Sequence, residues 1–134
     1  MIKFSDIQKG DILSANFEGT INIGEVTRLQ PDQKLVQVAH GDQEFWYGIN
    51  DLSPVALDET QLLRLKFEKQ ENEDGSVKYS KGAFRILLPR KGDFSHMEVW
   101  YRQERSIIEE PIFLHQLQNH YLRMTKVHLT EEVF

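Results

Sequence analysis

The chain has 134 residues, of which 40% are hydrophobic and 28% charged, and its formal net charge is −5. This length suffices for one compact core or two small subdomains, and the composition is that of a folded globular protein. No apolar run approaches the roughly 20 residues that a membrane helix needs. The absence of cysteine excludes disulfides, thiolate zinc sites and cysteine nucleophiles. No secretory signal is visible at the amino terminus, so the expected location is the cytoplasm.

The amino-terminal part of the chain reads as short strands separated by turn residues, and Lys9-Gly10-Asp11 leads into the first of them. Gly24 interrupts the second strand and predicts a bulge or a sharp bend. In the fourth strand, Phe45-Trp46-Tyr47, alternation places Trp46 on one face and its two neighbours on the other. Five such strands predict an SH3-like small β-barrel over residues 1–56.

After this region, Asp58 is placed to cap a helix over residues 59–66, with Gln61 returning a side-chain bond in a capping box. Phe67 is expected to begin a strand. Alternating segments from there to Arg102 predict antiparallel strands joined by hairpin turns. The leucines of the helix that are expected to pack inward are Leu62, Leu63 and Leu65.

Residues 113–124 predict a second, amphipathic helix, and Pro111 suits its first position. Val127 and Leu129 predict a last extended segment. The expected class is therefore α+β, with an antiparallel sheet and two helices over residues 57–134. The apolar residues that share an arc of about 100° on the second helix are Phe113, Leu114, Leu117, Tyr121 and Met124.

Charge is unevenly distributed along the chain. Residues 76–106 carry seven basic and three acidic side chains, a net charge of +4, although the whole chain is acidic. Such a segment can bind an anionic partner, or it can complement the acidic parts of its own chain. A self-complementary or merely solvated role is favoured over a binding role, because charge runs usually have no partner.

Three motifs connect the chain to a known family. Lys9-Gly10-Asp11 opens a strand, Ser53-Pro54 leads into the capped helix ending at Phe67, and the terminal helix carries His-x-Leu-Gln-Asn-x-Tyr from His115 to Tyr121. In these motifs and their order, most of the chain resembles a family of small uncharacterised proteins from Bacteroidetes genomes and their prophages. The chain departs from that family at His120, where an apolar residue is usual. The resemblance implies an α+β fold and no known activity.

The polar side chains of the second helix have two interpretations. His115, Gln118 and Asn119 lie at the edge of its apolar arc, where they can form a polar ligand site. They can also bond to backbone groups and lock the helix to the sheet, and this structural role is favoured because buried amides need partners. His115 with His128 and Glu131 or Glu132 is a weak candidate metal set. We therefore expect no metal site and no cofactor.

Three functional hypotheses follow. The leading one is a non-catalytic protein-binding or adaptor module of phage or mobile-element origin that does not bind membranes. The alternative is a nucleic-acid-binding accessory protein that uses the basic segment 76–106. The third is a small-molecule site or enzyme near His115. The candidate binding residues are Trp46, Tyr47, Arg85, Arg102 and Arg105.

Overall fold

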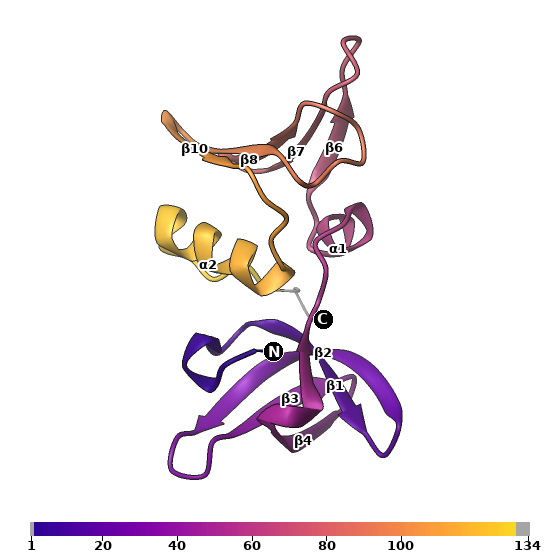
Figure 1. Ribbon diagram of the computed structural model, residues 1–134. Coiled ribbons are helices and arrows are strands. Elements are labelled where there is room, and N and C mark those ends of the chain that lie inside the picture. The colour runs from indigo at the N-terminus through magenta and orange to yellow at the C-terminus, as the bar shows by residue number, and fades with distance from the viewer. Residues whose placement is uncertain (1, 131–134) are drawn as a thin grey trace. The chain divides into compact units, whose positions relative to one another are not determined.

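The computed structural model describes residues 2–130 of the chain (Figure 1). The chain divides into two compact units, unit 1 over Met1–Val55 and unit 2 over Ala56–Phe134. Each unit contains one five-stranded antiparallel sheet, and both α-helices found among residues 2–130 belong to unit 2. The α+β class expected from the sequence is confirmed.

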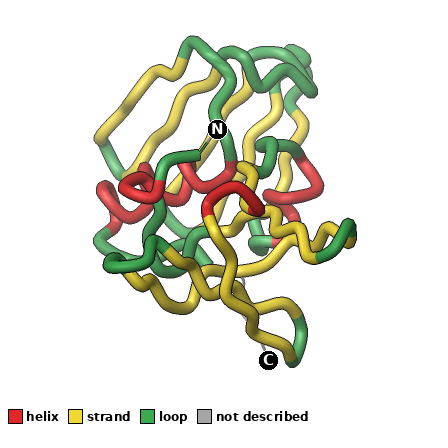
Figure 2. The backbone as a smooth tube through the Cα atoms, turned by 60° about the horizontal axis from the view of Figure 1, so that its bottom comes forward, coloured by secondary structure: helices red, strands yellow, loops and turns green. Residues whose placement is uncertain are grey.

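Unit 1 is a meander of four strands to which a fifth strand returns. The strand order is β4-β3-β2-β1-β5, so β5 pairs with the first strand and not with the fourth. A short 3₁₀ helix, η2 (Ile49–Asp51), joins β4 to β5. The strands are β1 (Ile12–Phe17), β2 (Thr20–Gln30), β3 (Leu35–His40), β4 (Gln43–Gly48) and β5 (Leu52–Pro54). In Figure 2, strands are yellow and the loops and turns that join them are green.

The second strand changes partner along its length. Residues 20–25 of β2 pair with β1, whereas residues 25–30 pair with β3. The irregularity expected at Gly24 lies between Val26 and Arg28, where the register with β3 shifts. Gly24 has a different role, because a Cβ atom built on it would lie 2.3 Å from the carbonyl oxygen of Ala39. Glycine therefore permits the backbones of β2 and β3 to approach closely.

One face of this sheet forms the core of unit 1. Side chains alternate between the two faces of a strand, so a buried row repeats every second residue. The 3₁₀ helix η1 (Phe4–Asp6) contributes Phe4, which packs against this core. The buried residues of the core are Ile2, Ile7, Leu13, Ala15, Val26, Val36, Val38, Tyr47 and Leu52.

Unit 2 contains a second meander with the strand order β10-β9-β8-β7-β6. Figure 1 shows both of its helices on the same side of this sheet. Phe84 is fully buried there, with its ring 6.2 Å from that of Phe67 and 4.8 Å from that of Tyr121. The strands are β6 (Glu68–Glu71), β7 (Val77–Lys81), β8 (Phe84–Leu88), β9 (Met97–Tyr101) and β10 (Glu104–Ile108).

The first helix, α1 (Glu59–Arg64), begins where the sequence predicts. The backbone N–H of Gln61 donates to Oδ1 of Asp58 at 2.9 Å, which confirms Asp58 as the cap. The prediction that Leu63 packs inward is wrong, since Leu63 is 45% exposed. It follows the buried Leu62 by 100° around the helix, which turns its side chain toward solvent.

The second helix, α2 (Leu114–Thr125), begins three residues after Pro111, so the prediction that this proline occupies the first helical position is wrong. The backbone N–H of Phe113 donates to Oε1 of Gln116 at 2.8 Å, which satisfies a donor at the start of the helix. Phe113 also forms an isolated β-bridge with Ala56. This pairing keeps Phe113 extended and leaves its ring exposed, outside the buried apolar stripe.

Candidate binding surfaces

Unit 1 contains a hollow of about 220 Å³, which we call the aromatic hollow. Two of its rings, those of Phe17 and Phe45, are stacked with centroids 5.3 Å apart and planes 9° from parallel. Both side chains remain open to solvent, with Phe17 47% and Phe45 40% exposed. The residues that line the aromatic hollow are Phe17, Thr20, Asn22, His40, Gln43, Phe45 and Tyr47.

The stacked pair requires strong curvature of the sheet. Phe17 belongs to β1 and Phe45 to β4, and β2 and β3 lie between these strands. At about 4.8 Å between neighbouring strands, the two rings would be at least about 14 Å apart across a flat sheet. Ring contact therefore shows that the sheet rolls toward its core face.

Register places the aromatic hollow on the same face as the core of unit 1. Phe17 lies two residues beyond the buried Ala15, and Phe45 lies two residues before the buried Tyr47. The aromatic hollow therefore continues the rows of core-facing side chains toward the end of the sheet. There the lining contains both apolar and polar side chains. Nδ1 of His40 lies 3.3 Å from the carbonyl oxygen of Ile23, which fixes the imidazole at the rim.

The two candidate residues of β4 lie on opposite faces of that strand. Tyr47 is buried and lines the aromatic hollow, as expected for a residue two positions from Phe45. Trp46 pairs with Gln37 in the register of β3 and β4 and is 44% exposed. The structure therefore brings Tyr47 to the hollow and separates Trp46 from it.

Sequence reasoning did not identify Phe17 as a candidate. The available signal was an apolar side chain directly before the polar turn Glu18-Gly19, where a hairpin ends. That signal does not show which distant strand the ring will meet.

The three candidate arginines of unit 2 gather around β9. Arg85 of β8 and Arg105 of β10 both pair with Trp100 in the register of the sheet. Each guanidinium carbon lies 5.5 Å from the centroid of the Trp100 ring, within the range of a cation–π contact. Arg102, in the turn between β9 and β10, stacks on Tyr101 at 5.2 Å.

Hydrogen bonds also hold these guanidinium groups within unit 2. Nη2 of Arg85 donates to the carbonyl oxygen of Arg102 at 2.6 Å. Nε of Arg105 donates to Oε1 of Glu98 at 2.7 Å, and this ion pair offsets its charge. These contacts fix Arg85 and Arg105 in place and occupy some of the N–H donors of their guanidinium groups.

Other cations of the basic segment also contact groups of unit 2. Nζ of Lys81 donates to the carbonyl oxygen of Leu65 at the end of α1, at 2.8 Å. Lys91 pairs with Glu71 at 2.6 Å, and Lys69 connects Glu71 to Glu59. Much of the positive charge of residues 76–106 thus complements the same unit.

A tyrosine extends this ionic network into the core. Tyr79 is buried and its hydroxyl donates to Oε1 of Glu59 at 2.9 Å. Burial, and secondarily the bond to Glu59, raise the pKa of Tyr79 to about 12. The hydroxyl is therefore a permanent donor that ties α1 to β7.

The polar candidates of α2 differ in their surroundings. His115 and Gln118 are buried, whereas Asn119 is partly exposed. The side-chain amide of Gln118 donates to the carbonyl oxygen of Leu129 at 2.6 Å. Residues 126–130 form no strand, so the extended segment expected at Val127 and Leu129 is not found within the part of the tail that the structure describes. The buried Leu129 instead anchors this loop beside α2.

We expect Gln118→Met to lower the free energy of unfolding of unit 2 by about 1–3 kcal/mol. Methionine has a similar length but no donor, so the buried carbonyl of Leu129 would lose its partner while packing is retained. Urea denaturation of the full chain measures this effect. Unchanged stability would contradict the locking role of this amide.

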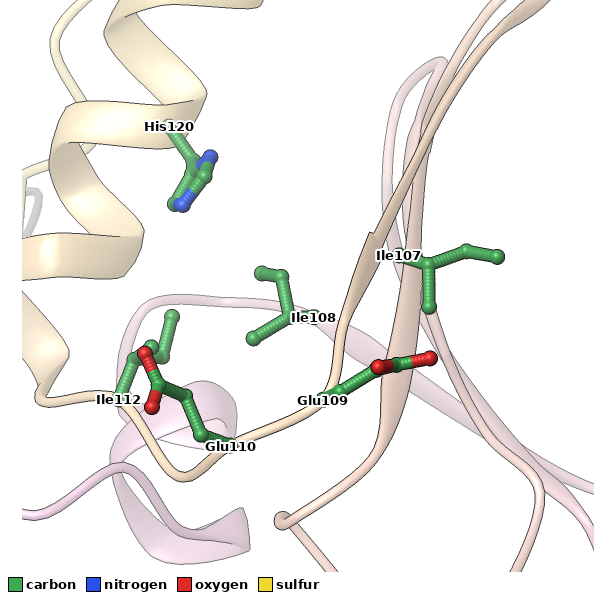
Figure 3. Close-up of a pocket in the computed structure, with 6 residues that line it drawn as sticks. All are labelled: Ile107, Ile108, Glu109, Glu110, Ile112 and His120. Atoms are coloured by element: carbon green, nitrogen blue, oxygen red, sulfur yellow. The ribbon is translucent and has the colours of Figure 1, made fainter.

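A second hollow, of about 470 Å³, lies at the end of β10 (Figure 3). We call it the edge hollow. His120 extends into it from α2, and its Nδ1 lies 2.6 Å from Nη2 of Arg123. Burial, and secondarily the charge of Arg123, lower the pKa of His120. The lining residues are Ile107, Ile108, Glu109, Glu110, Ile112 and His120.

Among residues 2–130, no group of three or more histidine, aspartate or glutamate side chains is arranged to hold a metal ion. Glu131 and Glu132, which belong to the candidate set with His115 and His128, lie outside the described residues.

Comparisons with known proteins give no further assignment. No protein-family model, curated protein or solved structure matches the chain. Membership of the Bacteroidetes and prophage family therefore stays a prediction. Neither α-helix within residues 2–130 has the length and apolar character of a membrane span.

Proposed function

We propose that this chain is a non-catalytic protein-binding module in which unit 1 is an SH3-like barrel. Its aromatic hollow would receive a proline-containing segment of the partner. The contact between Phe17 and Phe45 carries this proposal, because it combines a rolled sheet with an exposed aromatic surface.

The topology of unit 1 supports the barrel. A second strand that pairs with β1 through its first half and with β3 through its second half can serve both sides of a small barrel. The return of β5 to β1 after η2 continues the sheet beyond its first strand. Five strands in this order, with a short 3₁₀ turn before the last, are typical of SH3-like folds.

The lining chemistry supports a peptide ligand. Flat, solvent-open rings provide area for apolar side chains at a low cost in conformational entropy. The side chains of Thr20, Asn22 and Gln43 supply uncharged donors beside the rings. A polyproline II segment has unpaired backbone carbonyls and a preformed shape, so it suits an aromatic surface with nearby donors.

The test uses a short fluorescein-labelled proline-rich peptide and fluorescence polarisation with the full chain. We expect Phe45→Ala to weaken binding by about tenfold or more, since aromatic anchors of an interface often contribute 2 kcal/mol or more. Trp46→Ala is the matched control, because Trp46 is adjacent and similarly exposed but lies on the other face. Its affinity is expected to stay near that of the unmodified chain.

Two results would reject this assignment. Equal affinity of Phe45→Ala and the unmodified chain would exclude the aromatic hollow, and a loss confined to Trp46→Ala would move the site to the opposite face. A labelled oligothymidylate run in parallel tests the nucleic-acid alternative. Binding that weakens steeply as salt rises would favour that alternative. The binding site would then be the surface formed by Arg85, Trp100 and Arg105.

A further inference from the structure

The two edges of the sheet in unit 2 differ in their side chains. Within residues 2–130, β10 pairs only with β9 and β6 pairs only with β7. An edge strand directs alternate N–H and C=O groups outward, where another strand can pair with them. The edge β6 carries charged or amide side chains at all four positions, which disfavours such pairing. β10 ends in two isoleucines, and Ile107 is 49% exposed.

The position of the edge hollow shows that there is space beside β10. Consecutive residues of an extended chain point to opposite faces, and Figure 3 shows the side chains of Ile107 and Ile108 diverging in this way. Both nevertheless line the same hollow. Because both residues line it, the hollow reaches the edge of β10, where an added strand would run.

The charges around the edge hollow favour a basic ligand. Glu109 and Glu110 contribute two carboxylates. The lowered pKa of His120 leaves its imidazole largely neutral at pH 7, so Arg123 provides the facing positive charge on α2. At the other end of β10, Arg105 is paired with Glu98.

We propose that the β10 edge accepts an extended segment of a partner protein, which adds a sixth strand and places a lysine or arginine side chain in the edge hollow. Backbone hydrogen bonds to β10 would supply affinity, and the side-chain pocket would supply selectivity. The methylene stem of the basic side chain packs on Ile108 and Ile112, and its cation lies near Glu110, while Glu109 adds negative charge on the other side of the chain. This second surface is independent of the aromatic hollow and uses a different mode of recognition.

The test uses a short fluorescein-labelled peptide in which threonine and valine alternate around a central lysine. Fluorescence polarisation with the full chain measures its affinity. Exchange of the lysine for glutamate is expected to weaken binding by about tenfold or more, because the carboxylates would then repel the peptide. N-methylation of alternate peptide residues removes backbone donors without changing the protein, and it is expected to abolish binding.

Protein variants then locate the site. The double variant Glu109→Gln and Glu110→Gln is expected to lose most of the preference for lysine over glutamate. Glu73→Gln, in the exposed turn between β6 and β7, is the matched control and should keep that preference. Amide hydrogen exchange should slow at β10 when the peptide is bound, since outward N–H groups become paired.

Several outcomes would overturn the proposal. They are the absence of binding, binding that survives N-methylation, a lysine preference that survives loss of both carboxylates, and exchange protection away from β10. A concentration-dependent dimer with β10 protected in the free protein would assign the edge to a second copy of the chain. None of these outcomes decides the role of the aromatic hollow. That role is tested separately, by the affinity of the Phe45→Ala variant for the proline-rich peptide.

Discussion

Replacement of Gly24 with alanine is expected to lower the free energy of unfolding of unit 1 by about 3 kcal/mol. The added Cβ would lie 2.3 Å from the carbonyl oxygen of Ala39 and 2.7 Å from Cγ1 of Val38. A backbone oxygen cannot move aside without disturbing the pairing of β2 with β3. Most domains are stable by only about 5–15 kcal/mol, so this loss is a large fraction of the total.

Gly48→Ala is the matched control for this substitution. Gly48 also belongs to a strand of unit 1, its φ of −76° suits any residue, and nothing lies within 4 Å of a Cβ built there. Alanine should therefore be neutral or slightly stabilising, since it restricts the unfolded chain. The free energies of unfolding of the two variants are compared by urea denaturation. Amide hydrogen exchange of residues in unit 1 reports the unfolding of that unit. Similar stability of Gly24→Ala and Gly48→Ala would show that β3 does not approach β2 this closely.

The second large effect concerns pH and Asp11. The residue is only 3% exposed, and one oxygen of its carboxyl group accepts a hydrogen bond from the backbone N–H of Gln8 at 2.8 Å. Burial raises the pKa of Asp11 from 3.8 to about 7, and the bond from Gln8 opposes part of this rise. Between pH 3.8 and about pH 7, Asp11 is therefore protonated in the folded protein, whereas it has lost its proton in the unfolded chain.

The direction of the pH dependence follows from this difference in bound protons. Below pH 3.8 both states are protonated and Asp11 carries no penalty. As the pH rises toward 7 the contribution of this group destabilises unit 1, by at most about 4 kcal/mol, and it then becomes constant. Asp11→Asn retains an acceptor for Gln8 without a charge, so it should be the more stable form at pH 8 and nearly equal at pH 4.

Urea denaturation at pH 4, 6 and 8 checks this prediction. Asp32→Asn is the control, because Asp32 is an exposed turn residue of the same unit. Its pH profile should parallel that of the unmodified chain. Parallel profiles for Asp11→Asn and the unmodified chain would show that Asp11 titrates alike in the folded and unfolded states.

The order and type of the elements follow from local patterns. Period-two alternation and turn residues predict the strands of unit 1 and the strands of unit 2 up to β9, but β10 (Glu104–Ile108) was not predicted. Asp58 predicts the start of α1, because a cap acts on a backbone N–H only three residues away. Two predictions failed where a distant partner intervened. The bridge between Phe113 and Ala56 delays the start of α2, and contact with α2 buries Leu129 in a loop.

The binding surfaces depended on contacts between residues far apart in the sequence. The sequence alone determined that unit 1 is built of short strands with an aromatic fourth strand, and that a basic segment occupies unit 2. Only the tertiary structure decided that Phe17 meets Phe45, that Trp100 lies between Arg85 and Arg105, and that a hollow lies beside β10. Periodicity assigns a side chain to a face, but sheet curvature and register across several strands determine which faces and edges come together.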